Sequence, residues 1–221
     1  MSLFELDGPR FGPAAGGAPD SLVVLLHGLG ADGNDLIELA PILGQHLPHT
    51  AFVSPNAPFP CDMAPYGRQW FSLQDRSQSM ILAGVRAAAP ILDSFLDAEL
   101  ARLGLAGGRL ALLGFSQGTM MSLHVAPRRE TACAAVVGFS GALVGADQLA
   151  AEIRSKPPVL LIHGDADPVV PFQAMEAARQ ALSSAGIPVA TERRPGLPHS
   201  IDQPGLVRAI AHLTAGFAAK P

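Results

Sequence analysis

The pentapeptide Gly114-Phe115-Ser116-Gln117-Gly118 holds a serine between two glycines at a spacing suited to nucleophilic chemistry. It directly follows an apolar run, residues 110–113, and precedes a segment that can be helical. In an elbow of the G-x-S-x-G type, a sharp strand-to-helix turn exposes the serine hydroxyl, and the glycines leave room for the backbone. Because glycine and serine are common, an ordinary glycine-rich turn is the alternative. The rest of the chain must decide whether Ser116 is a nucleophile.

Candidate acid and base residues follow Ser116 in the order aspartate, then histidine. Asp165 and Asp167 come after the apolar run 159–162, and His199 comes after the next such run. A serine hydroxyl needs an imidazole to accept its proton, and the imidazole needs a carboxylate that fixes its tautomer and stabilises its charged form. The order Ser, Asp, His is the one that α/β-hydrolases use. Local chemistry leaves both aspartates open as the acid, since either can instead cap the turn.

A mostly parallel sheet is the element expected to bring these residues together. Short apolar runs alternate with longer segments of helical period, which is the pattern of βαβ units. The predicted strands are residues 22–26, 51–53, 110–113, 134–137, 159–162 and 189–192. The predicted helices are residues 34–46, 81–103, 172–185 and 205–218, with Pro90 either kinking the second helix or marking its start. Ligand sites in open α/β sheets gather at the carboxyl ends of the strands, where the candidate residues lie.

Three connecting segments add to this expectation. Residues 27–35 are rich in glycine, so their backbone N–H groups can turn toward one point. Residues 54–73 contain four prolines and the only tryptophan and tyrosine, and a loop of this length is usually a lid or a binding loop. Its aromatic content argues against disorder. Residues 2–12 could supply one or two antiparallel edge strands.

Length and composition predict a single domain over residues 1–221. Apolar residues make up 48% of the chain and charged residues 15%, which is enough for a large core. The net charge is −4, and the sequence has no cluster of Lys or Arg. Neither nucleic acid nor an anionic membrane surface is therefore an expected partner. The two cysteines are expected to be reduced. With no signal-like start and no uninterrupted apolar stretch of spanning length, we expect a cytoplasmic protein without stable membrane insertion.

The sequence offers two alternatives to a nucleophilic Ser116: a metal site and a second serine motif. A metal site built from His27, His163, Asp165 and Asp167 is conceivable by residue type, but the H-x-x-E-H and C-x-x-C spacings are absent from the sequence. No metal or cofactor is therefore expected. Ser140 lies in a second glycine-flanked motif, but Ala142 stands where an elbow needs its second glycine, so a structural role is expected for Ser140.

Four motifs together make the chain resemble a known family. They are HGLGADGND at 27–35, GFSQG at 114–118, HGDADPVVP at 163–171 and PHSI around His199, with GRQWF at 67–71 as a weaker fifth. These motifs resemble those of the phospholipase/carboxylesterase family of α/β-hydrolases, which includes acyl-protein thioesterases and small bacterial carboxylesterases. The matches span nearly the whole chain in the family's order.

The resemblance implies an α/β-hydrolase fold with a mostly parallel central sheet, helices on both faces and no large cap domain. It implies that Ser116 is the nucleophile, His199 the general base and Asp167, the aspartate before Pro168, the triad acid. It also makes the segment from about 55 to 75 a small lid. The implied binding residues are Leu29 and Gln117, whose backbone N–H groups form the oxyanion hole, and Trp70 and Val169, which lie near an acyl-binding groove.

The function implied is that of a carboxylesterase acting on small-molecule esters of short to medium acyl chains through an acyl-enzyme on Ser116, with thioesters as a second class of substrate. A lysophospholipase or an acyl-protein thioesterase falls within the same resemblance. A dienelactone hydrolase is disfavoured because its elbow carries cysteine. A non-catalytic binding protein on the hydrolase fold is a further alternative. It is disfavoured because all three triad residue types are present. A homodimer is compatible with the aromatic loop, since exposed apolar patches often mark interfaces.

Overall fold

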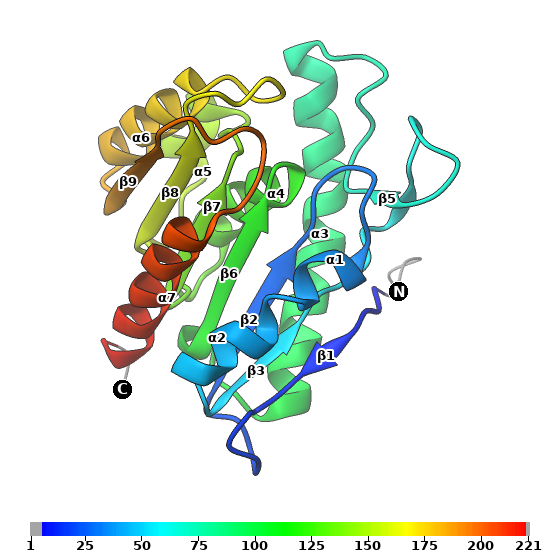
Figure 1. Ribbon diagram of the computed structural model, residues 1–221. Helices are drawn as coiled ribbons and strands as arrows, with labels where there is room; N and C mark the ends of the chain where they lie inside the picture. The colour runs from blue at the N-terminus through cyan, green and yellow to red at the C-terminus, as the bar shows by residue number, and fades with distance from the viewer. Residues whose placement is uncertain (1–5, 220–221) are drawn as a thin grey trace.

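The computed structural model describes residues 6–219, which form one mostly parallel sheet covered by helices (Figure 1). Within these residues the sheet has seven strands in the order β1-β3-β2-β6-β7-β8-β9. Neighbouring strands are parallel except for β1, which pairs antiparallel with β3. The strands are β1 Arg10–Phe11, β2 Ser21–Leu26, β3 Thr50–Val53, β6 Leu110–Phe115, β7 Ala135–Phe139, β8 Val159–Gly164 and β9 Val189–Arg194. All six predicted strands and the α/β-hydrolase type of sheet are confirmed.

Helices cover both faces of the sheet, as predicted. Residues 22, 24 and 26 of β2 face one apolar cluster, which holds the buried faces of α3, α4 and α6. Residues 23 and 25 face the other cluster, which holds α1, α2 and α7. Because both faces are covered, the central strands are nearly continuous apolar runs. The helices are α1 Gly33–Ile37, α2 Ala40–His46, α3 Gln78–Leu103, α4 Gln117–Val125, α5 Leu149–Glu152, α6 Gln173–Ser184 and α7 Gln203–Ala218.

The observed helices differ from the predicted ones at two prolines, Pro41 and Pro90. The predicted helix 34–46 is wrong as a single element, because the chain forms α1 and α2 with a break before Ala40. Pro41 lies in the first turn of α2, where its missing N–H is tolerated; in one continuous helix its nitrogen would have to donate to the carbonyl of Ile37, four residues earlier. Pro90 lies inside α3 and does not mark its start. That helix ends at Gly104, whose φ of 68° closes it in the left-handed conformation.

Among the described residues, one helix, α3, is long and apolar enough to cross a membrane by length and composition alone. Its apolar residues Val85, Leu92 and Leu96 are fully buried in the cluster on one face of the sheet. This apolar stripe is therefore used in the core of the domain.

The two remaining predicted segments, residues 2–12 and 54–73, contain only short strands in the described part of the chain. Within residues 6–12 there is a single edge strand, β1; residues 2–5 of that prediction lie outside the described part of the chain. Residues 54–73 contain a small hairpin of β4 Phe59–Pro60 and β5 Arg68–Gln69. We call residues 57–71 the strap, because hydrogen bonds join them to the glycine-rich loop at residues 27–35 and to Gln117 in the elbow.

His124, on α4, makes the folded state sensitive to acid. Burial, together with the neighbouring positive charge of Arg128, lowers the pKa of His124 from 6.5 to about 4. As the pH falls through this window, the unfolded chain binds a proton that the folded chain does not, so the free energy of unfolding decreases. We expect the melting temperature to fall between about pH 6.5 and 4, and to fall less steeply in His124→Gln. Circular dichroism melts across this range measure both slopes, and equal slopes would assign the acid sensitivity to other groups.

Candidate active site

Ser116 occupies a sharp turn between β6 and α4. Its backbone has φ 54° and ψ −115°, a strained conformation for a residue other than glycine. Its N–H donates to the carbonyl of Phe139 at 3.0 Å, and its carbonyl accepts from the N–H of Met120 at 3.2 Å. These bonds to the next strand and to the following helix hold the turn in place. The chain therefore makes the strand–turn–helix that the G-x-S-x-G motif requires.

The two glycines of this elbow allow three backbone segments to meet. A Cβ on Gly114 would lie 2.4 Å from the carbonyl carbon of Gly118. A Cβ on Gly118 would lie 1.8 Å from the carbonyl oxygen of Leu26, at the end of β2. Side chains at these positions would push α4 away from the sheet, and Ser116 with it.

Substitution of Gly118 by alanine is expected to destabilise the domain, because the clash is with backbone that cannot rotate away. Overpacking of this kind costs about 1–3 kcal/mol or more of the free energy of unfolding. Urea denaturation measures the loss. Gly16→Ala is the control, since Gly16 has φ 73° and nothing within 4 Å of an added Cβ. It reports the cost of a left-handed backbone without a clash, and a smaller loss in Gly118→Ala than in Gly16→Ala would contradict this account.

The structure pairs His199 with Asp167. The Nδ1 atom of His199 lies 2.7 Å from Oδ2 of Asp167. Because an ionised carboxylate only accepts hydrogen bonds, Nδ1 carries the proton and Nε2 is left free to accept one. The Asp167 side chain has no exposed surface, and its Oδ1 accepts from the backbone N–H groups of Val169 at 2.8 Å and Val170 at 2.9 Å. Both carboxylate oxygens are thus held in place.

The electrostatics keep this carboxylate charged. Burial alone would raise the pKa of Asp167, but the hydrogen bonds from His199 and from the N–H groups of Val170 and Val169 outweigh it and lower the pKa below its ordinary value. Asp167 is therefore ionised at neutral pH, as is required of a group that stabilises an imidazolium.

Asp165 has different partners. Its Oδ2 accepts from Nη2 of Arg193 at 2.6 Å and its Oδ1 accepts from the N–H of Gly196 at 2.6 Å. The pKa of Asp165 is lowered first by the hydrogen bond from Arg193 and then by that from Gly196. Asp165 therefore ties the end of β8 to the turn after β9, and its carboxylate is not the partner of His199.

His199 lies beside the elbow. Its ring packs against the ring of Phe115, the residue before Ser116, with centroids 4.7 Å apart and planes inclined at 45°. Ser116 itself is 8% exposed. The serine, the aspartate and the histidine thus follow the carboxyl ends of β6, β8 and β9, all strands of one sheet.

The glycine-rich loop, residues 27–35, lies against the elbow. A Cβ on Gly28 would lie 3.3 Å from Cβ of Ser116, so the backbone before Leu29 is in close contact with the serine. The loop is also joined to the strap by backbone bonds. The N–H of Gly30 donates to the carbonyl of Arg68 at 2.9 Å, and the N–H of Arg68 donates to the carbonyl of Ala31 at 2.8 Å.

Gln117 joins the strap to the elbow. Its buried side-chain amide accepts from the N–H of Trp70 at 3.1 Å and donates to the carbonyl of Phe71 at 2.9 Å. Trp70 has no exposed surface, so it cannot touch a substrate in this conformation; its indole N–H donates to the carbonyl of His27 at 3.0 Å. We therefore assign Trp70 to holding the strap. Val169, the other expected groove residue, is 62% exposed in the loop that carries Asp167.

The sequence suggests no role other than metal binding for two buried histidines, His27 and His163. His163, at the end of β8, has its Nε2 atom 2.9 Å from the carbonyl of Val170 and 3.3 Å from Oδ2 of Asp167. His27, at the end of β2, is bonded through both ring nitrogens to backbone groups. Both lie in predicted motifs, and His163 contacts residues of its own motif, whereas His27 contacts Ala57, which is 30 residues away. No group of three or more metal-ligating side chains is found in residues 6–219.

Ser140 forms a second strained turn after β7. Its φ is 48°, and its N–H donates to the carbonyl of Ile162 at 2.9 Å. A Cβ on the next residue, Gly141, would lie 3.0 Å from the carbonyl oxygen of Ser116. Ser140 therefore adjoins the elbow through its backbone turn.

Comparison with known proteins places these features in context. A family model described as Phospholipase/Carboxylesterase matches residues 14–216. The chain is similar to Esterase YpfH of Escherichia coli (strain K12), with 30% identity over 192 residues, 87% of this chain and 81% of that protein. It is also similar to Acyl-protein thioesterase 1 homolog 1 of Dictyostelium discoideum, with 30% identity over 75% of this chain and 76% of that protein. The crystal structure of esterase PE8 superposes with a TM-score of 0.91 and 45% identity, covering 95% of this chain and 98% of that one.

Proposed function

Because the chain belongs to the phospholipase/carboxylesterase family of α/β-hydrolases, we propose that it cleaves carboxylic esters through an acyl-enzyme on Ser116. The observation that carries the proposal is the hydrogen bond of 2.7 Å between His199 and the buried Asp167, beside a serine held at φ 54°. A fixed imidazole next to an elbow serine is the arrangement that nucleophilic acyl transfer needs.

In the first half of the proposed reaction, Nε2 of His199 accepts the proton of Ser116 Oγ as that oxygen attacks the substrate carbonyl. The backbone N–H groups of Leu29 and Gln117 donate hydrogen bonds to the carbonyl oxygen as negative charge develops on it. Each such donor contributes about 2.7–4 kcal/mol to lowering the barrier. Asp167 holds His199 in the required tautomer and stabilises its charged form.

In the second half, His199 gives its proton to the leaving alcohol or thiol as the carbonyl–oxygen or carbonyl–sulfur bond breaks. A water molecule, deprotonated by His199, then attacks the acyl-enzyme. The carboxylic acid leaves and Ser116 recovers its proton. These steps use only water, the substrate and groups of this chain.

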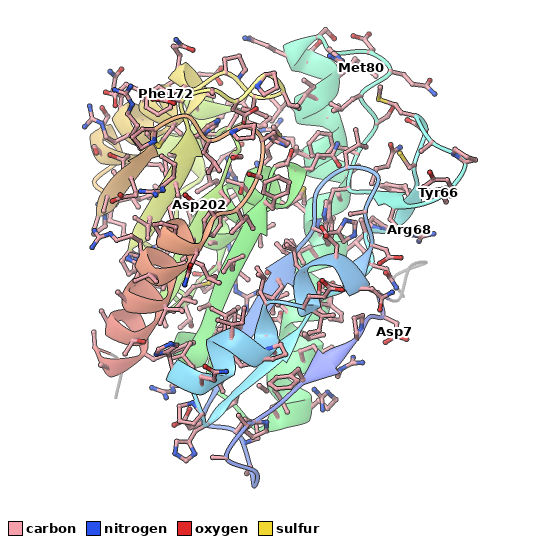
Figure 2. All side chains as sticks on the ribbon, viewed as in Figure 1. Asp7, Tyr66, Arg68, Met80, Phe172 and Asp202 are labelled. Carbon is pink, nitrogen blue, oxygen red and sulfur yellow. The ribbon has the colours of Figure 1, made fainter. Side chains whose placement is uncertain are left out.

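Esters of short to medium acyl chains are the proposed substrates. Exposed apolar side chains support this choice: Val169 lies two residues after Asp167, Tyr66 is on the strap, and Met80 is at the start of α3. Figure 2 shows two of these side chains on the same side of the molecule, Tyr66 on the strap and Met80 at the start of α3. A thioesterase activity on acylated proteins is the second candidate, favoured by the similarity to the Dictyostelium acyl-protein thioesterase homologue.

A fluorophosphonate probe tests the proposal directly. We expect the probe to modify the wild-type protein once, on Ser116 in the tryptic peptide 110–128, and to abolish hydrolysis of p-nitrophenyl butyrate in proportion to labelling. Tandem mass spectrometry distinguishes Ser116 from Ser122 in the same peptide. A series of p-nitrophenyl esters and an S-acylated peptide then separate the two candidates. Absence of both labelling and hydrolysis would favour a non-catalytic binding protein.

A further inference from the structure

His27 is a fully buried histidine at the end of β2 to which the mechanism above gives no role. Its Nε2 atom lies 3.0 Å from the backbone N–H of Ala57, and its Nδ1 atom lies 2.7 Å from the carbonyl oxygen of Gly28. A backbone N–H can only donate and a carbonyl can only accept. The ring is therefore neutral, with its proton on Nδ1, which donates to Gly28.

This hydrogen bond acts on the peptide unit that carries a proposed oxyanion donor. The carbonyl of Gly28 and the N–H of Leu29 belong to the same planar peptide, and in a trans peptide they point in opposite directions. Holding the carbonyl toward the His27 ring consequently directs the Leu29 N–H away from it. The close approach of Gly28 to Ser116 puts this peptide at the elbow.

The His27 ring is fixed by its neighbours, including Trp70. The carbonyl of His27 accepts from the indole of Trp70 at 3.0 Å, and the two rings lie 5.8 Å apart. Burial lowers the pKa of His27, which keeps the ring in its neutral form at neutral pH. Protonation would remove the acceptor for the Ala57 N–H.

We propose that His27 is a positioning residue for ester hydrolysis: its Nδ1–H fixes the Gly28–Leu29 peptide so that the Leu29 N–H faces the oxyanion. The inference rests on the function proposed above. It assigns His27 an effect on the transition state, in addition to its contact with the strap through Ala57.

A matched pair of variants separates the two contacts. The amide nitrogen of Asn in His27→Asn can take the place of Nδ1 and donate to Gly28, but nothing replaces Nε2. The amide oxygen of Gln in His27→Gln can take the place of Nε2 and accept from Ala57, but nothing replaces the Nδ1 donor. We expect His27→Gln to lower kcat about 10- to 100-fold with KM within about twofold, part of the loss seen when an oxyanion donor is removed. His27→Asn should keep kcat within about threefold of wild type.

A second measurement distinguishes this role from a merely structural one. An aryl trifluoromethyl ketone adds reversibly to the active serine and places an oxyanion in the hole. Its inhibition constant should rise in His27→Gln by the same factor as kcat falls, and remain near that of wild type in His27→Asn. Melting temperatures of both variants show whether the fold is intact. Equal losses in the two variants, or a greater loss in His27→Asn, would overturn the proposal.

The tautomer can also be read in the wild-type protein, which covers the case in which the variants do not fold. A long-range ¹H–¹⁵N spectrum should show His27 protonated on Nδ1 alone, and a proton on Nε2 would overturn the inference. If wild type shows no turnover that depends on Ser116, the proposed function fails. If wild type turns over and His27→Gln matches it, only the role of His27 fails.

Discussion

Replacement of Ser116 by alanine is expected to reduce kcat for p-nitrophenyl butyrate by roughly 10⁵- to 10⁶-fold. The variant lacks the oxygen that forms the acyl-enzyme, so only the oxyanion donors and substrate binding remain to accelerate attack by water. The fluorophosphonate probe should no longer label the protein. Steady-state hydrolysis at neutral pH, with the variant purified apart from wild type, measures the loss.

Ser140→Ala is the matched control for this prediction. Ser140 also follows a parallel strand and also has positive φ, but its hydroxyl is buried and makes no hydrogen bond within the described residues. We expect its removal to leave kcat within a few fold of wild type. A comparable loss in both variants would show that the Ser116 result reflects damage to the two adjoining turns, and residual labelling of Ser116→Ala would place the nucleophile elsewhere.

Asp167→Asn is expected to lower kcat by about 10⁴-fold, as loss of the acid does in other Ser-His-Asp triads. The amide can still accept bonds from Val169 and Val170 through its oxygen. Its NH₂ group then faces Nδ1 of His199, which favours the tautomer that carries the proton on Nε2. That tautomer cannot accept the proton of Ser116. The measurement is kcat for ester hydrolysis, accompanied by the melting temperature.

Asp165→Asn serves as the control, since it lies two residues away and removes the same charge. It weakens the bond from Arg193 but leaves the pair of His199 and Asp167 in place. Because the Arg193–Asp165 pair is partly exposed, its contribution to stability is small. We expect kcat within a few fold of wild type. The reverse ranking of the two variants would transfer the role of the acid to Asp165.

The strands could be predicted from the sequence, because each central strand is buried on both faces and reads as an apolar run. The strap hairpin could not. Its strands, β4 and β5, have two residues each, and its conformation depends on bonds to Gly30, Ala31 and Gln117, which are far away in sequence. The break between α1 and α2 was missed because apolar periodicity continues across it; Pro41 was the local signal that could have shown it.

The candidate site was predictable in its residue types but not in its pairings. The order along the chain pointed to Ser116 and His199, while local chemistry left two aspartates open. The partner of Asp165, Arg193, comes from the next strand, and no short-range pattern indicates it. The role inferred for His27 depends on a backbone N–H 30 residues away. Trp70 was expected beside a groove, but its complete burial follows from tertiary packing that the sequence does not display.

The bonds that join the strap to the glycine-rich loop at residues 27–35 and to the elbow determine when the conformational entropy of this segment is lost. Ordering a backbone residue costs about 1–2 kcal/mol at room temperature. A segment that closed over each substrate would incur this cost in every catalytic cycle. Here Gly30, Gln117 and His27 order the strap when the chain folds. The entropy loss therefore lowers the free energy of unfolding of the domain. It does not reduce the binding energy of each substrate, which remains available to stabilise the transition state.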